Sequence, residues 1–198
     1  MSESGTFYGT LIDPVLKKLR KRVIRHIEPG QTVLDIACGT GAQLFESAAV
    51  ISMAVGFDYS ESMINRAQKI KQQKNIDHLE FILHDATEEW PFYDYQFDVA
   101  VLSLALHQFS PKSYFVILNE MKRVATRQIF VDYAIPLPDN YAGLGSIVAE
   151  FFAGREHYKH FRQYGRLGGL HQILTRHRFT AVKEEFFGKN AFHLVVSS

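Results

Sequence analysis

The sequence predicts an α/β fold with a doubly wound, mostly parallel sheet of seven strands, helices on both faces and a closing antiparallel hairpin. Two observations support this prediction. Short apolar runs of strand length alternate with helical segments through the first two thirds of the chain. Near the end, the strand-like runs 182–187 and 191–196 are joined by a short turn. Such close strands can pair only antiparallel, because a parallel crossover needs about a dozen residues.

The first expected element is a helix that Asp13 caps and in which Pro14 takes the first helical position. Its apolar stripe consists of Ile12, Val15, Leu16, Leu19, Val23 and Ile27. The strands expected after it are 32–37, 53–57, 79–84, 97–102 and 129–133. The expected helices are 42–49, 60–71, 110–124, 141–166 and 167–177. At 198 residues the chain fits one domain.

The composition excludes several classes of protein. Apolar residues make up 46% of the chain, and no run approaches the roughly 20 uncharged apolar residues of a membrane helix. No apolar segment follows the polar N-terminus, so we expect no secretory signal, and the single cysteine, Cys38, suits a reducing cytoplasm. A net charge of +1 gives no long-range attraction to nucleic acid. We therefore expect a cytoplasmic protein without a nucleic-acid partner.

Polar or glycine signals follow three successive strands. Gly39 and Gly41 lie in the turn after the first strand, where a missing Cβ lets the backbone pass close to a ligand. Asp58 closes the second strand, where a carboxylate can accept hydrogen bonds from both hydroxyls of a ribose. Asp85 follows the third, where it can accept from an exocyclic amine. These signals predict a nucleoside site, and the alternative is ordinary turn chemistry without a ligand.

A family resemblance rests on the segments Val33–Gly41, Asp58, Asp85-Ala86 and Phe97–His107. Together they resemble the class I S-adenosylmethionine-dependent methyltransferases, in particular the small-molecule group that includes the quinone-biosynthesis C-methyltransferases. The resemblance extends from about Leu11 to Val196 and implies a Rossmann-like fold, S-adenosylmethionine as cofactor and S-adenosylhomocysteine as product. Cys38 stands where the quinone group usually has glycine, so the resemblance does not assign that group's reaction.

The resemblance implies which residues bind the methionine part of the cofactor. Asp35 is expected to organise the glycine turn and the methionine amino group. Gly39 and Gly41 are expected to face the methionine portion, and Ser103, just past the fourth strand, to lie near it. Tyr8 precedes the first helix, in a segment that folds over the cofactor in relatives, so it is either a shield for the sulfonium or part of a frayed end.

The nucleoside part has its own expected contacts. Asp58 is expected to bind the ribose, with Tyr59 and Met63 packed on the adenine. Asp85 is expected to accept from the adenine amine, and the backbone amide of Ala86 to donate to a ring nitrogen. Met63 also sits at helical spacing that suits plain core packing, which is the alternative for it.

The acceptor side is expected after the fifth strand, where this family commonly inserts a lid. The stretch 151–166 mixes rings and cations, which suits an acceptor with an apolar body and an anionic or phenolic group. Its candidate contacts are Arg155, His157, Tyr158, His160 and Tyr164. An ordinary amphipathic helix is the alternative. No carboxylate or cysteine stands at ligand spacing from its two histidines, so we expect no metal.

His107 is the candidate general base, because it follows the fourth strand at the expected active edge. The alternative is a helix-flanking residue with no chemistry. A base is needed only if the nucleophile arrives protonated. Relatives directed at nucleic acid or protein amides carry an Asn/Asp-Pro-Pro-aromatic segment here, which this chain lacks. We therefore expect a small-molecule or lipid-like acceptor.

The domain is expected to divide into a helical cap at 1–30, a cofactor-binding core at 31–135, an acceptor lid and helix at 136–177, and a hairpin at 178–198. The lysines and arginines of the first helix form a basic face that we expect to be solvated. Contact with an anionic membrane is the alternative. The sequence leaves the oligomeric state open.

Two other functions compete with methyl transfer. A nicotinamide-dependent oxidoreductase would need a third small residue at position 44, where this chain has Leu44. The second alternative is a methyltransferase-like module that binds the cofactor without transferring methyl, because no acceptor-side residue is diagnostic.

Overall fold

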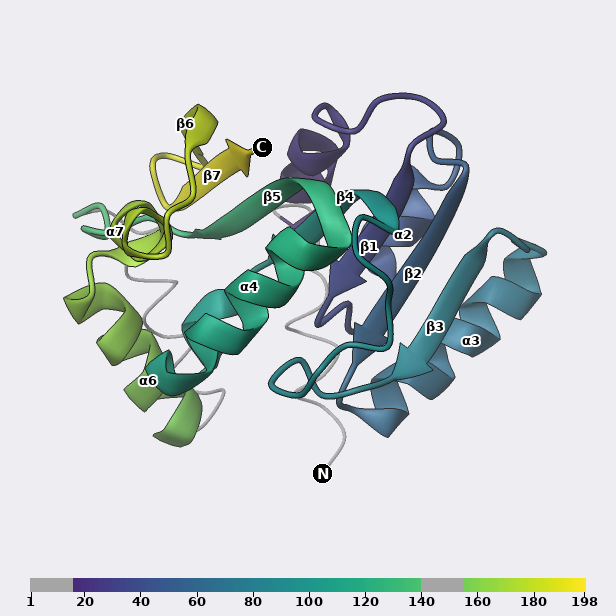
Figure 1. Cartoon of the computed structure of the whole chain (residues 1–198), viewed down its shortest axis with the longest axis horizontal. Coiled ribbons are helices and arrows are strands. Elements are labelled where there is room, and N and C mark those ends of the chain that lie inside the picture. Colours follow the sequence, from purple (N-terminus) through teal and green to yellow (C-terminus); the bar gives the residue numbers. More distant parts are fainter. Residues whose placement is uncertain (1–15, 140–154) are drawn as a thin grey trace.

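A computed structural model describes residues 16–139 and 155–198, which form a seven-stranded sheet in the order β3-β2-β1-β4-β5-β7-β6 (Figure 1). The strands are β1 Thr32–Ile36, β2 Met53–Asp58, β3 Leu79–Leu83, β4 Phe97–Ser103, β5 Ala125–Tyr133, β6 Ala181–Phe187 and β7 Phe192–Ser197. The first five are parallel, and β7 runs antiparallel to both β5 and β6. The predicted doubly wound sheet with its closing hairpin is thus confirmed.

Helices cover both faces of this sheet. Figure 1 shows α4 (Tyr114–Val124) in front of it, with α2 (Ala42–Ser47) and α3 (Glu61–Lys74) behind. α7 (Gly169–Arg176) packs on β5 and β7, while α6 (Arg155–Arg166) packs mainly on the short 3₁₀ helix η1 (Leu106–Gln108). A second 3₁₀ turn, η2 (Pro111–Ser113), leads into α4. In the part of the chain that is described, no helix is long and apolar enough to cross a bilayer.

The first helix, described over residues 16–24, buries Leu19 and Val23 of the predicted apolar stripe, and Ile27 is buried in the bend just after it. Its basic face is partly neutralised by the rest of the protein. The Arg20 Nε atom lies 2.6 Å from a Glu46 carboxylate oxygen on α2, and an Arg22 guanidinium nitrogen lies 3.0 Å from Glu185 on β6. These two cations therefore tie the helix to α2 and to β6.

Several element boundaries differ from the prediction, two of them because glycine or proline changes the backbone conformation. The helix expected from 167 begins at Gly169, because Gly168 and Gly169 both have positive φ. The helix expected from 110 is split into η2 and α4 after Pro111. β3 ends at Leu83, so Asp85 lies two residues past the strand. The expected helix 141–166 is described only as α6.

Candidate cofactor and acceptor site

The carboxyl ends of β1, β2 and β4 meet at one edge of the sheet, the lower edge in Figure 1. The chain order reverses between β1 and β4, and doubly wound sheets bind ligands in the crevice at such a point. Asp35 lies near the end of β1, Asp58 ends β2 and the half-buried Ser103 ends β4. The structure therefore brings the predicted methionine and ribose contacts to one edge.

The turn after β1 depends on two glycines for different reasons. Gly39 has φ +56°, and a Cβ added there would meet no heavy atom within 4 Å, so the backbone borders open space. Gly41 has φ +74°, and its Cβ would lie 2.4 Å from the buried Phe81 ring. Gly39 thus leaves room for a ligand, whereas Gly41 is required by packing inside the protein. Burial raises the pKa of the thiol of Cys38, which precedes Gly39, and this keeps the thiol protonated and unreactive.

Asp58 is held by the backbone around it. Its carboxylate accepts a hydrogen bond from the Gly39 amide and another from the Ser60 amide, both at 2.9 Å, and the residue is 8% exposed. A carboxylate offers about four lone-pair sites. Two remain after these bonds, one on each oxygen, which matches the two adjacent hydroxyls of a ribose. Asp58 is therefore fixed in place before any ligand binds.

Asp35 is a buried carboxylate that lacks a full set of partners. It is 3% exposed, and among the described residues its Oδ2 atom has no hydrogen-bond partner. Burial, reinforced by the nearby Asp58 carboxylate, raises the pKa of Asp35 to about 8. A cation beside it would relieve both effects. The orphaned oxygen and the open space at Gly39 together fit the ammonium end of a methionine-derived cofactor.

Three of the four adenine contacts predicted after β2 and β3, namely Tyr59, Met63 and Asp85, are exposed. Tyr59 is 72% exposed and Met63 42% exposed, so neither is a core residue. Asp85 is exposed, and its Oδ1 accepts from the amide and the hydroxyl of Thr87, both at 2.8 Å. That oxygen belongs to a turn, which leaves Oδ2 for a ligand. Ala86 is buried, and its carbonyl accepts from the Trp90 indole. Tyr8 lies outside the described residues.

His107 sits beneath the edge rather than on it. It is 1% exposed, and its Nδ1 donates to Asp132 Oδ1 at 2.5 Å, while its amide donates to Asp132 Oδ2 at 3.1 Å. Its ring packs against Tyr133 and Phe161, with centroid distances of 4.8 and 6.0 Å. This pairing, which the sequence analysis missed, fastens η1 to β5. The signal for it was a carboxylate, Asp132, inside the otherwise apolar run 129–133.

The five acceptor candidates on α6 fall into three groups. Tyr164 is fully buried, donates to the Tyr133 carbonyl and accepts from the Leu170 amide, so it is a core residue with an occupied hydroxyl. His160 donates to the Gln108 carbonyl at 2.7 Å and links α6 to η1. Arg155 is exposed, and His157 and Tyr158 are half-buried. Of these five, Tyr158 lines a pocket beside α6.

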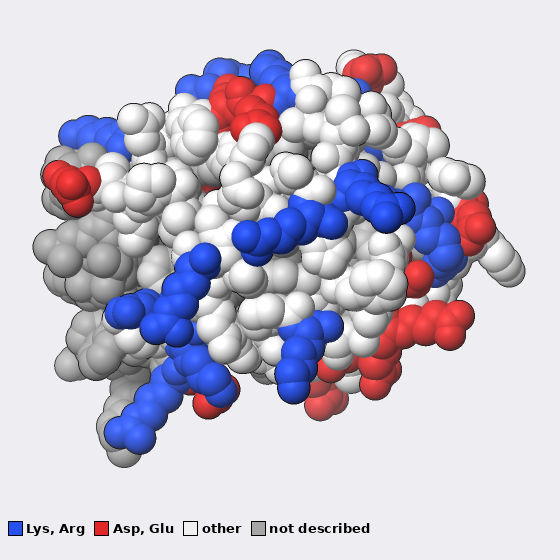
Figure 2. Space-filling model, turned by 60° about the vertical axis from the view of Figure 1, so that its left-hand side comes forward, with Lys and Arg blue, Asp and Glu red and all other residues white. Residues whose placement is uncertain are grey.

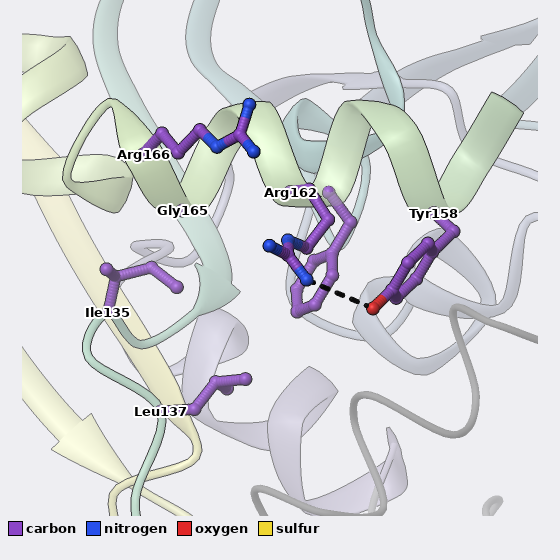
Figure 3. Close-up of a pocket in the computed structure, with 7 residues that line it drawn as sticks. Ile135, Leu137, Tyr158, Arg162, Gly165 and Arg166 are labelled. Carbon is purple, nitrogen blue, oxygen red and sulfur yellow. Dashed lines mark hydrogen bonds between the residues drawn. The ribbon is translucent and has the colours of Figure 1, made fainter.

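That pocket has a volume of about 320 Å³ and lies between α6 and the chain just after β5 (Figure 3). Its apolar wall comes from Ile135, Leu137 and Phe161, and Arg162 reaches from α6 toward the Tyr158 hydroxyl. Ile135, Leu137 and Arg162 were not predicted as site residues. The four-residue spacing of Tyr158 and Arg162 on one helical face was the available signal for Arg162. In the two described ranges, no three His, Cys, Asp or Glu are arranged to hold a metal ion.

Comparisons with known proteins agree with this geometry. Residues 27–150 match the family described as "Methyltransferase domain". The demethylmenaquinone methyltransferase of Oceanobacillus iheyensis is 30% identical over 113 residues, which cover 54% of this chain and 46% of that protein. The chain thus matches about half the length of this relative.

Solved structures share the fold. A SAM-dependent methyltransferase from Aquifex aeolicus has a TM-score of 0.67 at 19% identity, covering 90% of this chain and 88% of that one. A magnesium protoporphyrin IX methyltransferase from Synechocystis with bound S-adenosylhomocysteine has a TM-score of 0.64 at 17% identity, covering 91% and 81%.

The chain belongs to the methyltransferase domain family and has the fold of the class I S-adenosylmethionine-dependent methyltransferases. The matched residues contain the glycine turn, Asp35, Asp58, Asp85 and η1. The nicotinamide alternative has no support here, since Leu44 is fully buried inside α2 where a small residue would be needed.

Proposed function

We propose that this protein transfers a methyl group from S-adenosylmethionine to a small-molecule acceptor bound beside α6. The observation that carries the proposal is the orphaned, buried oxygen of Asp35 next to the open turn at Gly39. Natural proteins seldom leave a buried carboxylate oxygen without a partner, because the desolvation of that group costs stability. A cationic ligand would provide the missing partner.

When bound, S-adenosylmethionine would supply an activated methyl group for in-line displacement by the acceptor nucleophile, with the electron pair of the broken S–C bond remaining on S-adenosylhomocysteine. The protein's task is alignment and the exclusion of water. Asp35 would hold the methionine ammonium and Asp58 the ribose hydroxyls. Tyr59 and Met63 would cover the adenine, with Asp85 and the Ala86 amide at its edge. The segment 31–135 is thus proposed as the cofactor-binding core.

His107 fits a positioning role better than that of a general base. A base must come within hydrogen-bond reach of the proton that it removes, yet this imidazole is buried and bonded to Asp132. Through that bond it fixes η1, which in turn receives the His160 bond from α6. The proton of a protonated nucleophile would then leave to solvent or to a group on the acceptor itself.

The test is methyl transfer itself. Purified protein is incubated with S-adenosylmethionine labelled in its methyl group and with a deproteinised small-molecule cell extract. We expect label in a compound other than the cofactor with wild-type protein, and none with Asp58→Ala, which lacks the ribose ligand. If the protein binds the cofactor but labels nothing in extracts from several sources, the alternative of a binding module without transfer is favoured.

A further inference from the structure

The pocket beside α6 combines an apolar interior with a cation. Ile135, Leu137 and Phe161 form the apolar part, and Phe161 is buried against the His107 and Tyr133 rings. The Arg162 guanidinium extends from α6 into the space that Leu137 and Tyr158 border (Figure 3). Arg166, one turn further along α6, also lines the pocket. An apolar wall opposite a charged group is the pattern of a site for an amphipathic ligand.

The positive charge at this pocket is not neutralised by the rest of the described protein. Arg162 donates a hydrogen bond of 3.4 Å to the neutral Tyr158 hydroxyl. Among the described residues, no carboxylate lies within 4.0 Å of Arg162 or Arg166, and the acidic residue of α6, Glu156, is 3.5 Å from Lys159 instead. Figure 2, which brings the α6 side of the molecule forward, shows a run of Lys and Arg side chains across this face.

We propose that the methyl acceptor is a small organic anion whose apolar or aromatic body lies against Ile135, Leu137 and Phe161 and whose carboxylate or phosphate pairs with Arg162. This inference rests on the proposed function, since it names the acceptor class of that site. The planar guanidinium donates two parallel hydrogen bonds to either oxyanion. Binding would therefore give Arg162 the anionic partner that the described protein does not provide.

The position of the pocket agrees with this assignment. Ile135 and Leu137 follow β5, at the same edge of the sheet at which β1, β2 and β4 end. The Tyr164 hydroxyl and the His160 ring fix α6 to β5 and η1, so the arginine is carried on a rigid support. A volume of about 320 Å³ accommodates about ten non-hydrogen atoms at the roughly 30 Å³ that a water molecule takes up in the liquid. The acceptor is thus of the size of a substituted single ring.

The test uses single-ring probes with and without an anionic group. Binding of cinnamate, its neutral isostere cinnamamide and phenyl phosphate is measured by calorimetry on the full chain with saturating S-adenosylhomocysteine. We expect an anion to bind at least about tenfold more tightly than the amide, which corresponds to about 1.4 kcal/mol. Tighter binding of phenyl phosphate would indicate a phosphate-bearing acceptor, and tighter binding of cinnamate a carboxylate.

Three variants locate the effect. Arg162→Gln should remove the preference for the anion while changing the affinity for cinnamamide less than about twofold. Arg162→Lys should keep part of the preference, because it keeps the charge. Lys159→Gln is the matched control: it removes one positive charge from the exposed side of the same helix, outside the pocket, and should leave all three affinities unchanged.

Several outcomes would overturn the proposal. Equal affinities for amide and anions in the wild type, no binding of either anion at millimolar concentration, or an equal loss for all three probes in Arg162→Gln would each contradict it. Melting curves of each variant check folding. Two measurements separate this proposal from the proposed function. Failure of the protein to bind S-adenosylhomocysteine would count against methyl transfer. The anion preference at Arg162 is measured independently, by the same probe titrations without S-adenosylhomocysteine.

Discussion

The Asp58 carboxylate, at the end of β2, accepts a hydrogen bond of 2.9 Å from the Gly39 amide in the turn after β1. This single contact joins the proposed ribose-binding residue to the turn proposed to border the methionine part of the cofactor. The contact is possible because β1 and β2 pair in parallel with Ile36 opposite Phe57, which brings the ends of the two strands together. Asp58 and the glycine turn of the proposed cofactor site therefore hold each other in place.

The two glycines of the turn should respond differently to the same substitution. Gly41→Ala should lower the free energy of unfolding by about 2–4 kcal/mol, because the new methyl group meets the Phe81 ring and φ is positive. Gly39→Ala should cost only the backbone strain of about 1–2 kcal/mol, because its Cβ position is open. Denaturant unfolding measures both values.

Gly39→Ala, the less destabilising of the two substitutions, should be the one that weakens cofactor binding. Gly39→Ala places a methyl group where the backbone borders the ligand, so it should weaken S-adenosylhomocysteine binding at least about tenfold in a folded protein. If Gly39→Ala binds as tightly as wild type, the open space at this turn is not the cofactor site.

Asp35→Asn should stabilise the protein without cofactor, and increasingly so as the pH rises. The folded pKa of Asp35, about 8, is raised above its unfolded value, so the folded state holds a proton that the unfolded state has lost. The stability of the wild type therefore falls between about pH 4 and pH 8, a change that the neutral amide removes. The difference in melting temperature between variant and wild type should be small at pH 5 and largest near pH 8.

The same residue should make cofactor binding depend on pH. An ammonium beside Asp35 favours the ionised carboxylate, so at neutral pH binding must release a proton. The affinity of the wild type for S-adenosylhomocysteine should rise from pH 6 to pH 8, whereas that of Asp35→Asn should be weaker and nearly constant. Calorimetry in buffers of different ionisation enthalpy measures the released proton directly. A flat wild-type profile would mean that Asp35 does not face the ammonium.

Asp132 should contribute strongly to the stability of the fold. It is fully buried and accepts from His107 Nδ1 and from the amides of His107 and Tyr133. Asp132→Ala leaves these donors unpaired, so we expect a loss of about 3–5 kcal/mol in chemical denaturation. Tyr164→Phe, which removes one hydroxyl with two bonds, should cost about 1–3 kcal/mol. A loss below about 1 kcal/mol for Asp132→Ala would show that the pairing contributes little.

The strands were predictable because their signal is local. The apolar runs 53–57 and 79–84 are each followed directly by an aspartate, Asp58 or Asp85, which marks the turn that follows. The hairpin was predictable from the short connection alone. Helix starts were less so: Gly168 and Gly169 looked like ordinary helix residues, and only their positive φ moved the start of α7.

The site was predictable where it depends on one strand end, as for Asp35, Gly39 and Asp58. It was not predictable where it depends on which strands are neighbours. His107 and Asp132 are 25 positions apart and meet only because β4 and β5 pair in parallel. Tyr164 looked like a ligand-facing ring, yet its place on α6 turns it toward Tyr133. Periodicity was the available signal, because Tyr158, Phe161 and Tyr164 recur every three residues on the helical face that α6 buries.

The central claim is that the edge formed by β1 and β2 binds the cofactor through Asp58. Titration of S-adenosylhomocysteine into wild type, Asp58→Ala and Asp85→Ala by calorimetry tests it most directly. We expect wild type to bind with one site and Asp58→Ala to lose about a hundredfold or more, since two charge-assisted hydrogen bonds are each worth about 1.5–3 kcal/mol. Asp85→Ala removes at most one exposed contact that water can replace, so its affinity for S-adenosylhomocysteine should fall about tenfold or less. No binding by wild type at millimolar ligand, or an unchanged affinity in folded Asp58→Ala, would contradict the claim.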